Sequence, residues 1–442
     1  MSLYSTASDY AKDTWLPVYP DMLTRSEGTL LNLLGLSTDE RVKIEGRRAF
    51  MKVQIGDDLG FGVIGQGGDY PASGDIASDE ATLSLMRFAD TIEFDGHEMA
   101  LLDSLSAAAA PIMQKKMSAS RMRVLRELER MAIMDGTGIL AKVASETGSI
   151  MTLDVAGSAY SERNPYTWID DPNRSYYLCV DPASGADVMT ATAGKFLITL
   201  INEGTNAVTS SNDTGGSAAA DVIVTYHPAG YATAGAFASP EFVGLLGMIA
   251  STGTYMGIDR AAVPQWGSTV IDGSGTLRDI TKNIVDELCN KVSRRSESGM
   301  LVPSEYCGLA DPGVWTAYEN LMSTGIRYTI SESPDIGWGG REYLSMNGVP
   351  LYKHAQAPRH QIMLVHKKSA GFVGPKHDHS SIVKFEEHGG SIFFKKNAAS
   401  GSGYADASLA MITGWMGMYT ERPRNHGRLN DLNLTAPAYA GQ

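Results

Sequence analysis

Cysteine is scarce in this chain. Only Cys179, Cys289 and Cys307 occur among the 442 residues, and they form no Cys-x-x-Cys pair. A sparse, odd set of this kind excludes a disulfide framework and disfavours a cysteine-ligated zinc site. The N-terminus lacks a basic start followed by an apolar run, and the most apolar stretch, about 229–258, is rich in Gly, Ala and Ser. We therefore expect neither a secretory signal nor a membrane-spanning helix.

Basic residues are outnumbered by acidic ones. Lys plus Arg total 37 against 50 for Asp plus Glu, which gives a formal net charge of −13. Because the phosphates of a nucleic acid repel a negatively charged chain, we do not expect binding to a nucleic-acid backbone to be its main role. Hydrophobic residues make up 43% of the chain, enough to bury a substantial core, and the patterns below predict an α+β protein.

Common enzyme motifs are also missing from the sequence. It contains no G-x-S-x-G, H-E-x-x-H or G-x-x-x-x-G-K-[ST] pattern, and carboxylate pairs such as Glu386-Glu387 are adjacent, so they point apart on a strand. Residues Gly60–Gly65 spell G-x-G-x-x-G, but the Gly- and Pro-containing segment that follows cannot open the helix that a dinucleotide site needs. We predict a non-enzymatic protein that holds no cofactor.

Histidines are concentrated late in the chain, where six of nine fall between His354 and His388. On a strand, His377 and His379 would share one face, and His366 or His388 would supply a third metal ligand. Several lysines lie in the same segment. Surface or interface histidines are therefore the favoured interpretation, and no metal site is assigned.

A long acidic hairpin is predicted near the N-terminus. Residues 48–57 alternate apolar and polar side chains, a second strand-like run covers 83–94, and the segment between them is polar and rich in glycine. Nine acidic residues and a single base, Arg87, lie between positions 54 and 96. A loop this long and polar cannot fold onto its own core, so we expect it to project and to need a partner surface.

The strongest helix signal covers 112–134, where apolar residues recur at helical spacing and Gly136 suits a left-handed position after the end. Six bases and two acids lie on this helix. A basic helix that follows an acidic loop suits a contact between copies of one chain, although a solvated helix face explains the charges equally well.

The rest of the sequence predicts a β-rich insertion followed by helices and strands. The insertion is expected over 143–240, and a helix capped by Thr276 is expected after it. Strand edges are expected at 300–303 and 306–309, a helix from Pro312 to about Met322, and strands over 343–420.

In its order of parts, the sequence resembles the tailed-phage major capsid proteins of the HK97-like fold. The resemblance covers about 45–430. It rests on the N-terminal arm, the acidic hairpin, the helix ending in Leu128–Gly138, the two helices around Met300–Pro303 and Asp311-Pro312, residues 347–365, and Tyr419–Gly427. Two features depart from the minimal fold: the β-rich stretch after the long helix, and the lack of a charged coiled-coil segment before the arm.

The resemblance implies an α+β fold with an arm, an extended loop, a spine helix, and peripheral and axial domains. The implied divisions are an N-terminal arm (1–47), an extended loop (48–97), the spine-helix region of the peripheral domain (98–142), a β-rich insertion (143–240), an axial domain (241–335), peripheral-domain strands (336–430) and a C-terminal tail (431–442).

As a function, the resemblance implies self-assembly into the pentamers and hexamers of an icosahedral virion shell. That shell would form in the host cytoplasm, without a membrane, and enclose double-stranded DNA without sequence-specific contacts. The implied partners are a separate scaffolding protein, a portal and, as an open alternative, a decoration protein. An encapsulin-like nanocompartment shell has the same fold. A metal-dependent enzyme using the His354–His388 cluster is the alternative from a different class.

Contacts between subunits are expected to pair the acidic loop with basic residues of a neighbour. The acidic candidates are Asp57, Asp58, Asp69, Asp75, Asp79 and Glu80, and the basic candidates are Arg47, Arg48, Lys52, Arg121, Arg123 and Arg126. Some members of the family crosslink their shells through a lysine in the extended loop. Because no lysine lies between Gln54 and Met86, we predict a shell without such isopeptide bonds.

Overall fold

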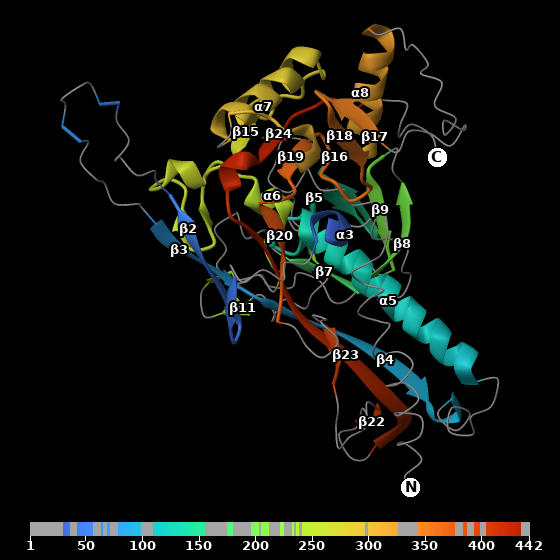
Figure 1. Cartoon of the computed structure of the whole chain (residues 1–442). Coiled ribbons are helices and arrows are strands. Elements are labelled where there is room, and N and C mark those ends of the chain that lie inside the picture. The colour runs from blue at the N-terminus through green and yellow to red at the C-terminus, as the bar shows by residue number, and fades with distance from the viewer. Residues whose placement is uncertain are drawn as a thin grey trace, which may run out of the picture. The chain divides into compact units, whose positions relative to one another are not determined.

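The chain divides into two structural units, which are described one after the other (Figure 1). The first comprises Met1–Val53, Asp79–Ala132 and Gly371–Tyr419, and the second comprises Gln54–Ser78, Ile133–Ala370 and Thr420–Gln442. The computed structural model describes residues 30–35, 42–55, 63–64, 69–70, 78–98, 109–154, 175–179, 196–202, 205–211, 222–224, 232–233, 236–237, 241–296, 299–325, 343–375, 383–386, 393–397 and 404–434.

Long antiparallel strands form the framework of the first unit. β4 (Met86–Asp95) pairs with β23 (Tyr404–Thr420) from Ala407↔Asp95 to Met416↔Met86. Three shorter strands also pair with β23, namely β20 (Ala370–Val373), β21 (Val383–Phe385) and β22 (Phe393–Asn397). β23 thus ties together segments that lie about 300 residues apart in the sequence.

A second sheet of the first unit contains β1 (Lys43–Glu45), β2 (Arg48–Gln54) and β3 (Ser78–Ser84), in that order. Burial alternates along β2, so that Met51 and Val53 are buried while Lys52 is exposed. This alternation confirms the half-buried strand predicted from the sequence. The short helix α3 (Leu30–Leu34) also belongs to this unit, and its Leu30 is buried.

The predicted strand over 83–94 is in fact two strands that join different sheets. β3 lies beside β2, whereas β4 pairs with β23. Leu85 lies between them, and its backbone N–H donates to the carbonyl of Arg47 at 2.8 Å. The connection of the predicted hairpin therefore spans residues 55–77, and the acidic residues of β4 lie outside it.

The helix predicted over 112–134 is α5 (Ala109–Ile133), which runs alongside β4 and β23 (Figure 1). Met117 and Leu128 on its apolar face are almost completely buried. Asp90 of β4 accepts a hydrogen bond from the Ser120 hydroxyl of α5. After the helix, Gly136 has a φ of +84°, the left-handed conformation expected at this position.

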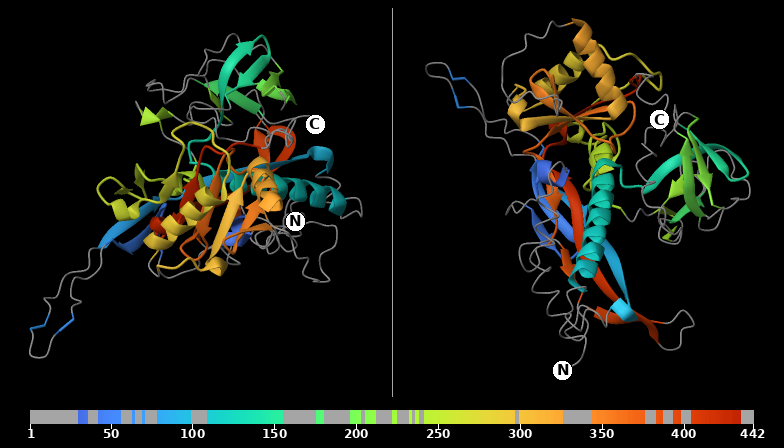
Figure 2. Two further views of the ribbon diagram at one scale, coloured as in Figure 1. Left: turned by 90° about the horizontal axis from the view of Figure 1, so that it is seen from above. Right: turned by 90° about the vertical axis from the view of Figure 1, so that its right-hand side faces the viewer.

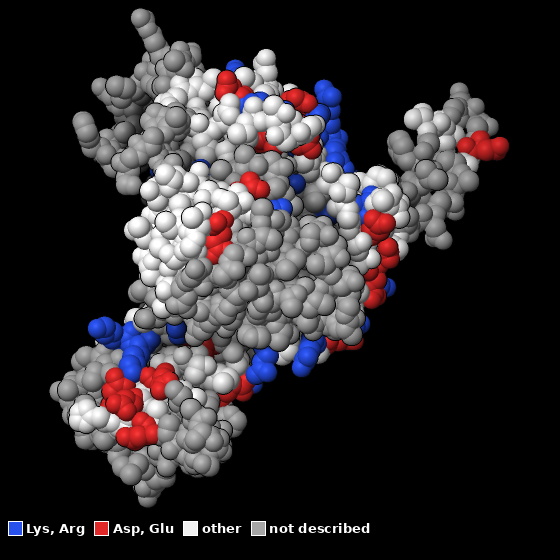
Figure 3. Space-filling model, turned by 180° about the vertical axis from the view of Figure 1, so that it is seen from behind, with Lys and Arg blue, Asp and Glu red and all other residues white. Residues whose placement is uncertain are grey.

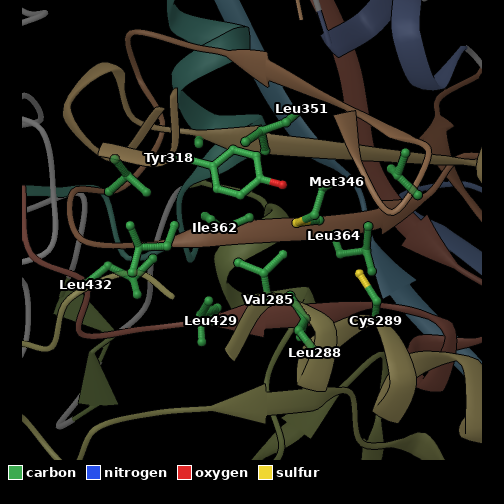
Figure 4. Close-up of a cluster of buried hydrophobic side chains, with 14 of the residues drawn as sticks. Val285, Leu288, Cys289, Tyr318, Met346, Leu351, Ile362, Leu364, Leu429 and Leu432 are labelled. Atoms are coloured by element: carbon green, nitrogen blue, oxygen red, sulfur yellow. The ribbon is translucent and has the colours of Figure 1, made fainter. Parts of the chain in front are cut away.

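A six-stranded sheet and two helices form the core of the second unit. The strand order is β15 (Thr269–Ile271), β24 (Gly427–Leu429), β19 (Ile362–His366), β16 (Tyr306–Ala310), β18 (Val349–Lys353) and β17 (Tyr343–Met346). β16 and β18 are parallel, and α8 (Pro312–Gly325) lies between them in the chain. Side chains from α8, from α7 (Lys282–Arg295) and from all six strands meet in one apolar core (Figure 4).

This sheet corrects three expectations. β17, β18 and β19 join β15 and β16, so the boundary expected at residue 336 does not separate two sheets. α7 is capped by Thr281 rather than by Thr276. Arg278, which lies between the two threonines, pairs with Leu432 in an isolated bridge and donates its backbone N–H to the carbonyl of Asp431, so it cannot enter the helix. Residues 300–303 form no strand edge, since the 3₁₀ helix η5 (Pro303–Glu305) begins there. The second helix begins at Pro312 as predicted, with the Asp311 carboxylate accepting from the N–H of Gly313 at 2.9 Å.

A small closed barrel occupies part of the sequence that was predicted to be a β-rich insertion (Figure 2). Its strands are, in spatial order, β10 (Val222–Val224), β5 (Ile139–Thr147), β6 (Ile150–Leu153), β9 (Ala207–Ser210), β8 (Phe196–Asn202) and β7 (Ser175–Cys179). Tyr176 and Phe196 fill its interior with ring centroids 6.1 Å apart. The barrel begins at Ile139, a few residues before the expected start at 143.

Short elements complete the second unit. They are β11 (Ala232–Thr233), β12 (Ala236–Phe237), α6 (Leu245–Met248), β13 (Thr254–Tyr255), β14 (Ile258–Asp259), η4 (Pro264–Trp266) and η7 (Pro423–Asn425). The buried Arg260 guanidinium donates to the carbonyls of Gly247, Met248 and Thr252, which ties the segment around α6 together.

Candidate assembly surface

The described part of the β2–β3 connection exposes large apolar side chains. Val63 is 94% exposed and Tyr70 is 89% exposed, while Ile64 is 42% exposed. The acidic candidate Asp69 beside Tyr70 is also exposed. Apolar groups left in water favour a covering surface, which this part of the chain does not supply itself. Three further acidic candidates, Asp57, Asp58 and Asp75, lie outside the described residues.

Acidic and basic candidates lie on neighbouring strands of the β1–β2–β3 sheet. Asp79 and Glu80 are exposed on β3, and Arg48 and Lys52 are exposed on the adjacent β2. Among the described residues, no ion pair joins these four side chains. The sequence analysis assigned the two signs to opposite partners of a contact, but the structure places both on one sheet of one subunit. Any neighbour that binds here therefore meets a surface of mixed charge.

The candidate Arg47 is held by its own chain. Its guanidinium lies 5.2 Å from the centroid of the Trp415 ring on β23, and Arg87 of β4 lies 5.9 Å from the same ring. Arg87 also pairs with Glu386 at 3.3 Å. A hydrogen bond from the Thr413 hydroxyl, 2.6 Å long, is the main cause that lowers the pKa of Glu386. Nothing in the local sequence signals that Trp415 lies beside Arg47.

The basic helix is partly neutralised within its own unit. Arg123 pairs with Asp90 of β4 at 2.7 Å, and Lys116 pairs with Glu98. The other two candidates, Arg121 and Arg126, are half-buried and make contacts of their own. Seen from behind, the molecule shows acidic and basic side chains next to one another at several places (Figure 3). The helix is therefore less free to bind a neighbour's acids than its sequence indicates.

Sequence reasoning missed the acids that hold this helix. Asp90 and Glu98 were not among the candidates, because the run around Asp90 was treated as part of one projecting loop. The available signal was the strand alternation of 86–95, which orients Asp90 as a strand residue. Its carboxylate is 13% exposed and binds both Ser120 and Arg123, so it acts as a link within the subunit.

His354 and His360 of the predicted cluster have separate structural partners. His360 Nδ1 lies 2.7 Å from the carbonyl of Leu432 and therefore donates to it, while His354 Nδ1 accepts from the N–H of Gln356 at 3.2 Å. Within the described ranges, no group of three His, Cys, Asp or Glu residues is placed to hold a metal ion. His377, His379 and His388 of the predicted cluster lie outside these ranges.

A buried polar network surrounds His426, which the sequence analysis did not single out. Its Nδ1 accepts from the backbone N–H of His366 at 3.0 Å, so the ring proton is on Nε2, which donates to the Thr420 hydroxyl at 2.9 Å. The Ser369 hydroxyl bonds His366 Nδ1 at 2.9 Å, and His366 Nε2 faces Glu305 at 3.4 Å. Burial is the main cause that lowers the pKa of His426 to about 3, so the imidazole is neutral.

The buried thiols and the helices show no reactive or membrane-spanning features. Burial raises the pKa of Cys289 to about 11 and that of Cys307 to about 12, so both thiols stay protonated at neutral pH. Among the described helices, none is long and apolar enough to cross a membrane.

Comparisons with known proteins identify the fold. No protein-family model and no curated protein matches the chain. Among solved structures, the capsid asymmetric unit of cyanophage A-1(L) is similar to this chain with a TM-score of 0.52 and 10% sequence identity, over 91% of this chain and 92% of that one. The capsid of the native GTA particle is similar over 92% and 90% of the two chains, with 10% identity and a TM-score of 0.46. The SrpI encapsulin of Synechococcus elongatus is similar over only 44% of this chain, with 14% identity and a TM-score of 0.28. The chain therefore has the HK97-like fold of phage capsid proteins, as its order of elements predicts.

Proposed function

We propose that the protein is the major capsid protein of a tailed phage, and that its copies form the pentamers and hexamers of an icosahedral shell. The observation that carries this proposal is a similarity to a phage capsid structure that extends over 91% of the chain. The proposed location is the virion, where the shell encloses double-stranded DNA. A separate scaffolding protein and a portal, with or without a decoration protein, are the proposed partners.

The proposed assembly mechanism uses the β2–β3 connection as a link between subunits. Val63 and Tyr70 would bury their exposed surface against a neighbour, and each fully buried side chain of this size contributes about 1.5–3 kcal/mol. Acids of the connection, including Asp57, Asp58 and Asp69, would add ion pairs with a neighbour's bases. A single exposed pair contributes only about 0–1 kcal/mol, so the charges set the register and the apolar residues supply most of the affinity.

Among the basic candidates, Arg48 and Lys52 suit this contact best. Both are exposed on β2, and among the described residues neither forms an ion pair. Arg47 and Arg123 are already engaged by Trp415 and Asp90, so an incoming carboxylate would have to share them. Arg121 and Arg126 are half-buried on α5 and are therefore the weaker candidates.

The test is electron microscopy of the purified full-length protein, with its contents analysed for nucleic acid. Closed shells containing double-stranded DNA in infected cells support the capsid proposal. Shells that enclose a cargo protein and no genome would support the encapsulin-like alternative. A soluble monomer at every concentration and salt condition, with metal-dependent turnover, would support the enzyme alternative and overturn the proposal.

A charge-reversal pair tests the assembly mechanism. We expect Asp57→Lys with Asp58→Lys to reduce shell yield at least tenfold while the subunit still folds. The control is Asp272→Lys with Glu287→Lys, which makes the same change in net charge at two exposed acids outside the loop. Normal shells from the loop variant, or an equal loss from the control variant, contradict loop pairing while leaving the capsid fold itself untouched.

A further inference from the structure

One part of the second unit gathers positive charge although the chain is acidic. Three short segments meet there: the end of α7, the turn between β19 and β20, and the start of η7. We call the group the basic patch, and its six members are Arg294, Arg295, Lys367, Lys368, Arg422 and Arg424. Two acidic residues lie beside these bases, Glu421 before η7 and Glu305 at the end of η5, and Glu305 pairs with Lys368. Six bases and two acids give the patch a net formal charge of +4, in a chain whose formal net charge is −13.

Backbone contacts hold the three segments together. The N–H of Lys367 donates to the carbonyl of Glu305, and the N–H of Glu421 donates to the carbonyl of Ser369, each at 2.8 Å. α7 packs against η7. Arg295 donates to the carbonyl of Gly267 at 2.7 Å, and Thr269 beside it bonds the carbonyl of His426 at 3.1 Å. The patch is therefore built on rigid elements of one unit.

Some of the basic side chains stand close enough to act on the same groups. Burial, followed by the charge of Arg424, lowers the pKa of Arg295. Burial is also the main cause that lowers the pKa of His366, and Lys368 and Arg422 lower it further against the opposing effect of Glu305. Arg294, Lys368 and Arg422 are exposed. Like charges gathered at an exposed surface repel one another, and a polyanion that binds there relieves the repulsion.

The side chains around the patch favour a backbone contact over base recognition. Trp266 lies nearby in η4, but its ring is buried and its Nε1 donates to the carbonyl of Tyr255 at 3.0 Å. Asn425, between Arg424 and His426, is also buried. Among the described residues, the patch offers no exposed aromatic ring for stacking on single-stranded bases. One exposed side-chain amide, that of Gln265 in η4, lies nearby, but the six charged groups outnumber it, and lysine and arginine suit the phosphates of duplex DNA.

We infer that the basic patch binds the phosphate backbone of duplex DNA without regard to sequence. The inference rests on the proposed capsid function, in which the enclosed duplex would be the ligand, and it names the surface that contacts it. A second copy's acidic loop is the competing occupant, and the experiment separates the two.

The experiment measures the affinity of the purified full-length protein for a fluorescent 20-base-pair duplex over a range of salt concentrations. The variant is Lys368→Gln with Arg422→Gln, and the control is Lys43→Gln with Lys282→Gln, two exposed bases of which Lys282 lies at the opposite end of α7. Each lost phosphate contact reduces the slope of log affinity against log salt by about 0.9. We therefore expect the variant's slope to fall by about 1.8 while the control keeps the wild-type slope, for duplexes of any sequence.

Several outcomes overturn the inference. They are no measurable binding by the wild type, an unchanged slope in the variant, an equal fall in the control, or strong preference for one duplex sequence. If the variant binds DNA normally but no longer forms shells, the patch binds a second copy instead of DNA. Electron microscopy of the same preparations shows separately whether the wild type forms shells, so a failure of the capsid proposal is visible independently of the binding assay.

Discussion

His426 makes the stability of the second unit depend on pH. The pKa of His426 is about 3 in the folded chain, against 6.5 for an unperturbed imidazole. Between these two pH values the imidazole binds a proton in the unfolded chain but not in the folded chain. The free energy of unfolding therefore does not depend on this imidazole above about pH 6.5, and it decreases as the pH falls below that value. The free energy of unfolding is predicted to fall by roughly 1 kcal/mol per pH unit near pH 5.5, and by about 2 kcal/mol between pH 7 and pH 5.

The structure also shows why protonation is unfavourable. His426 Nδ1 accepts from the N–H of His366, so a proton on that nitrogen would face another donor. His360 and His366 have pKa values lowered by burial as well, and they add to the pH dependence in the same direction. The lowered pKa of Glu305, caused mainly by hydrogen bonding from Lys368, contributes only at more acidic pH, because a carboxylate loses its stabilising pair below about 4.5.

The assay is urea unfolding of the purified subunit from pH 7.5 to pH 5, followed by a probe in the second unit. We expect His426→Gln to lower the free energy of unfolding at pH 7.5, where a buried hydrogen bond is lost, and to reduce its pH slope by roughly 1 kcal/mol per unit near pH 5.5. His97→Gln, which changes an exposed histidine, is the control and should keep the wild-type slope. Parallel curves for wild type and His426→Gln would refute the assignment of the pH dependence to this imidazole.

Three further predictions concern packing, backbone and crosslinking. Gly136→Ala should destabilise the subunit clearly more than Gly148→Ala in thermal melts, because both glycines have positive φ but only at Gly136 would a Cβ lie 2.9 Å from a backbone oxygen, that of Phe242; equal losses would contradict this reasoning. Leu288→Ala should lower the free energy of unfolding by about 2–5 kcal/mol, because Leu288 is fully buried in the core of Figure 4. Leu277→Ala, at a 39% exposed position, should lower it far less in the same unfolding assay. Mature particles boiled in detergent should run as single subunits on a gel, because the loop between Gln54 and Met86 has no lysine for an isopeptide bond, and a covalent ladder mapped to that loop would disprove this.

Local patterns predicted the elements whose stability is local. The alternation in β2, the helical spacing in α5, and the Asp311-Pro312 start of α8 all appear in the structure where expected. In each case, the apolar face or the cap lies within the segment itself, so a short window of sequence contains the information. The left-handed Gly136 belongs to the same group.

Predictions failed where distant residues determine the local structure. Thr276 and Thr281 are equally good caps by type, and the choice falls on Thr281 because Arg278 pairs with Asp431 and Leu432, about 150 residues away. The run from Leu83 to Phe94 reads as one strand, yet it breaks at Leu85 because β3 and β4 have different partners. Such pairings involve residues that are distant in the sequence, so the segment alone does not predict them.

The charged candidates were harder to predict for a related reason. Spacing along the sequence showed a basic helix and an acidic loop, but not that Asp90 would bind Arg123 or that Arg47 would lie over Trp415. Opposite charges of one chain pair within the subunit in preference to pairing with a neighbour, because a contact inside a folded chain loses no translational or rotational freedom through association. A base that is paired in this way, such as Arg123 with Asp90, must be shared with its internal partner when a neighbour binds it.

A chain that is 10% identical to a phage capsid protein can keep that fold because packing tolerates most apolar substitutions of similar volume. Buried positions such as Leu288, Leu364 and Leu429 need only remain apolar and fill space. Contacts between copies are different, because a charge must meet its opposite at one position on the neighbour. A similar structure at this identity shows the fold alone, so the proposed contacts between copies must be argued from this chain's own surface: the exposed Val63 and Tyr70 of the β2–β3 connection and the exposed Arg48 and Lys52 of β2.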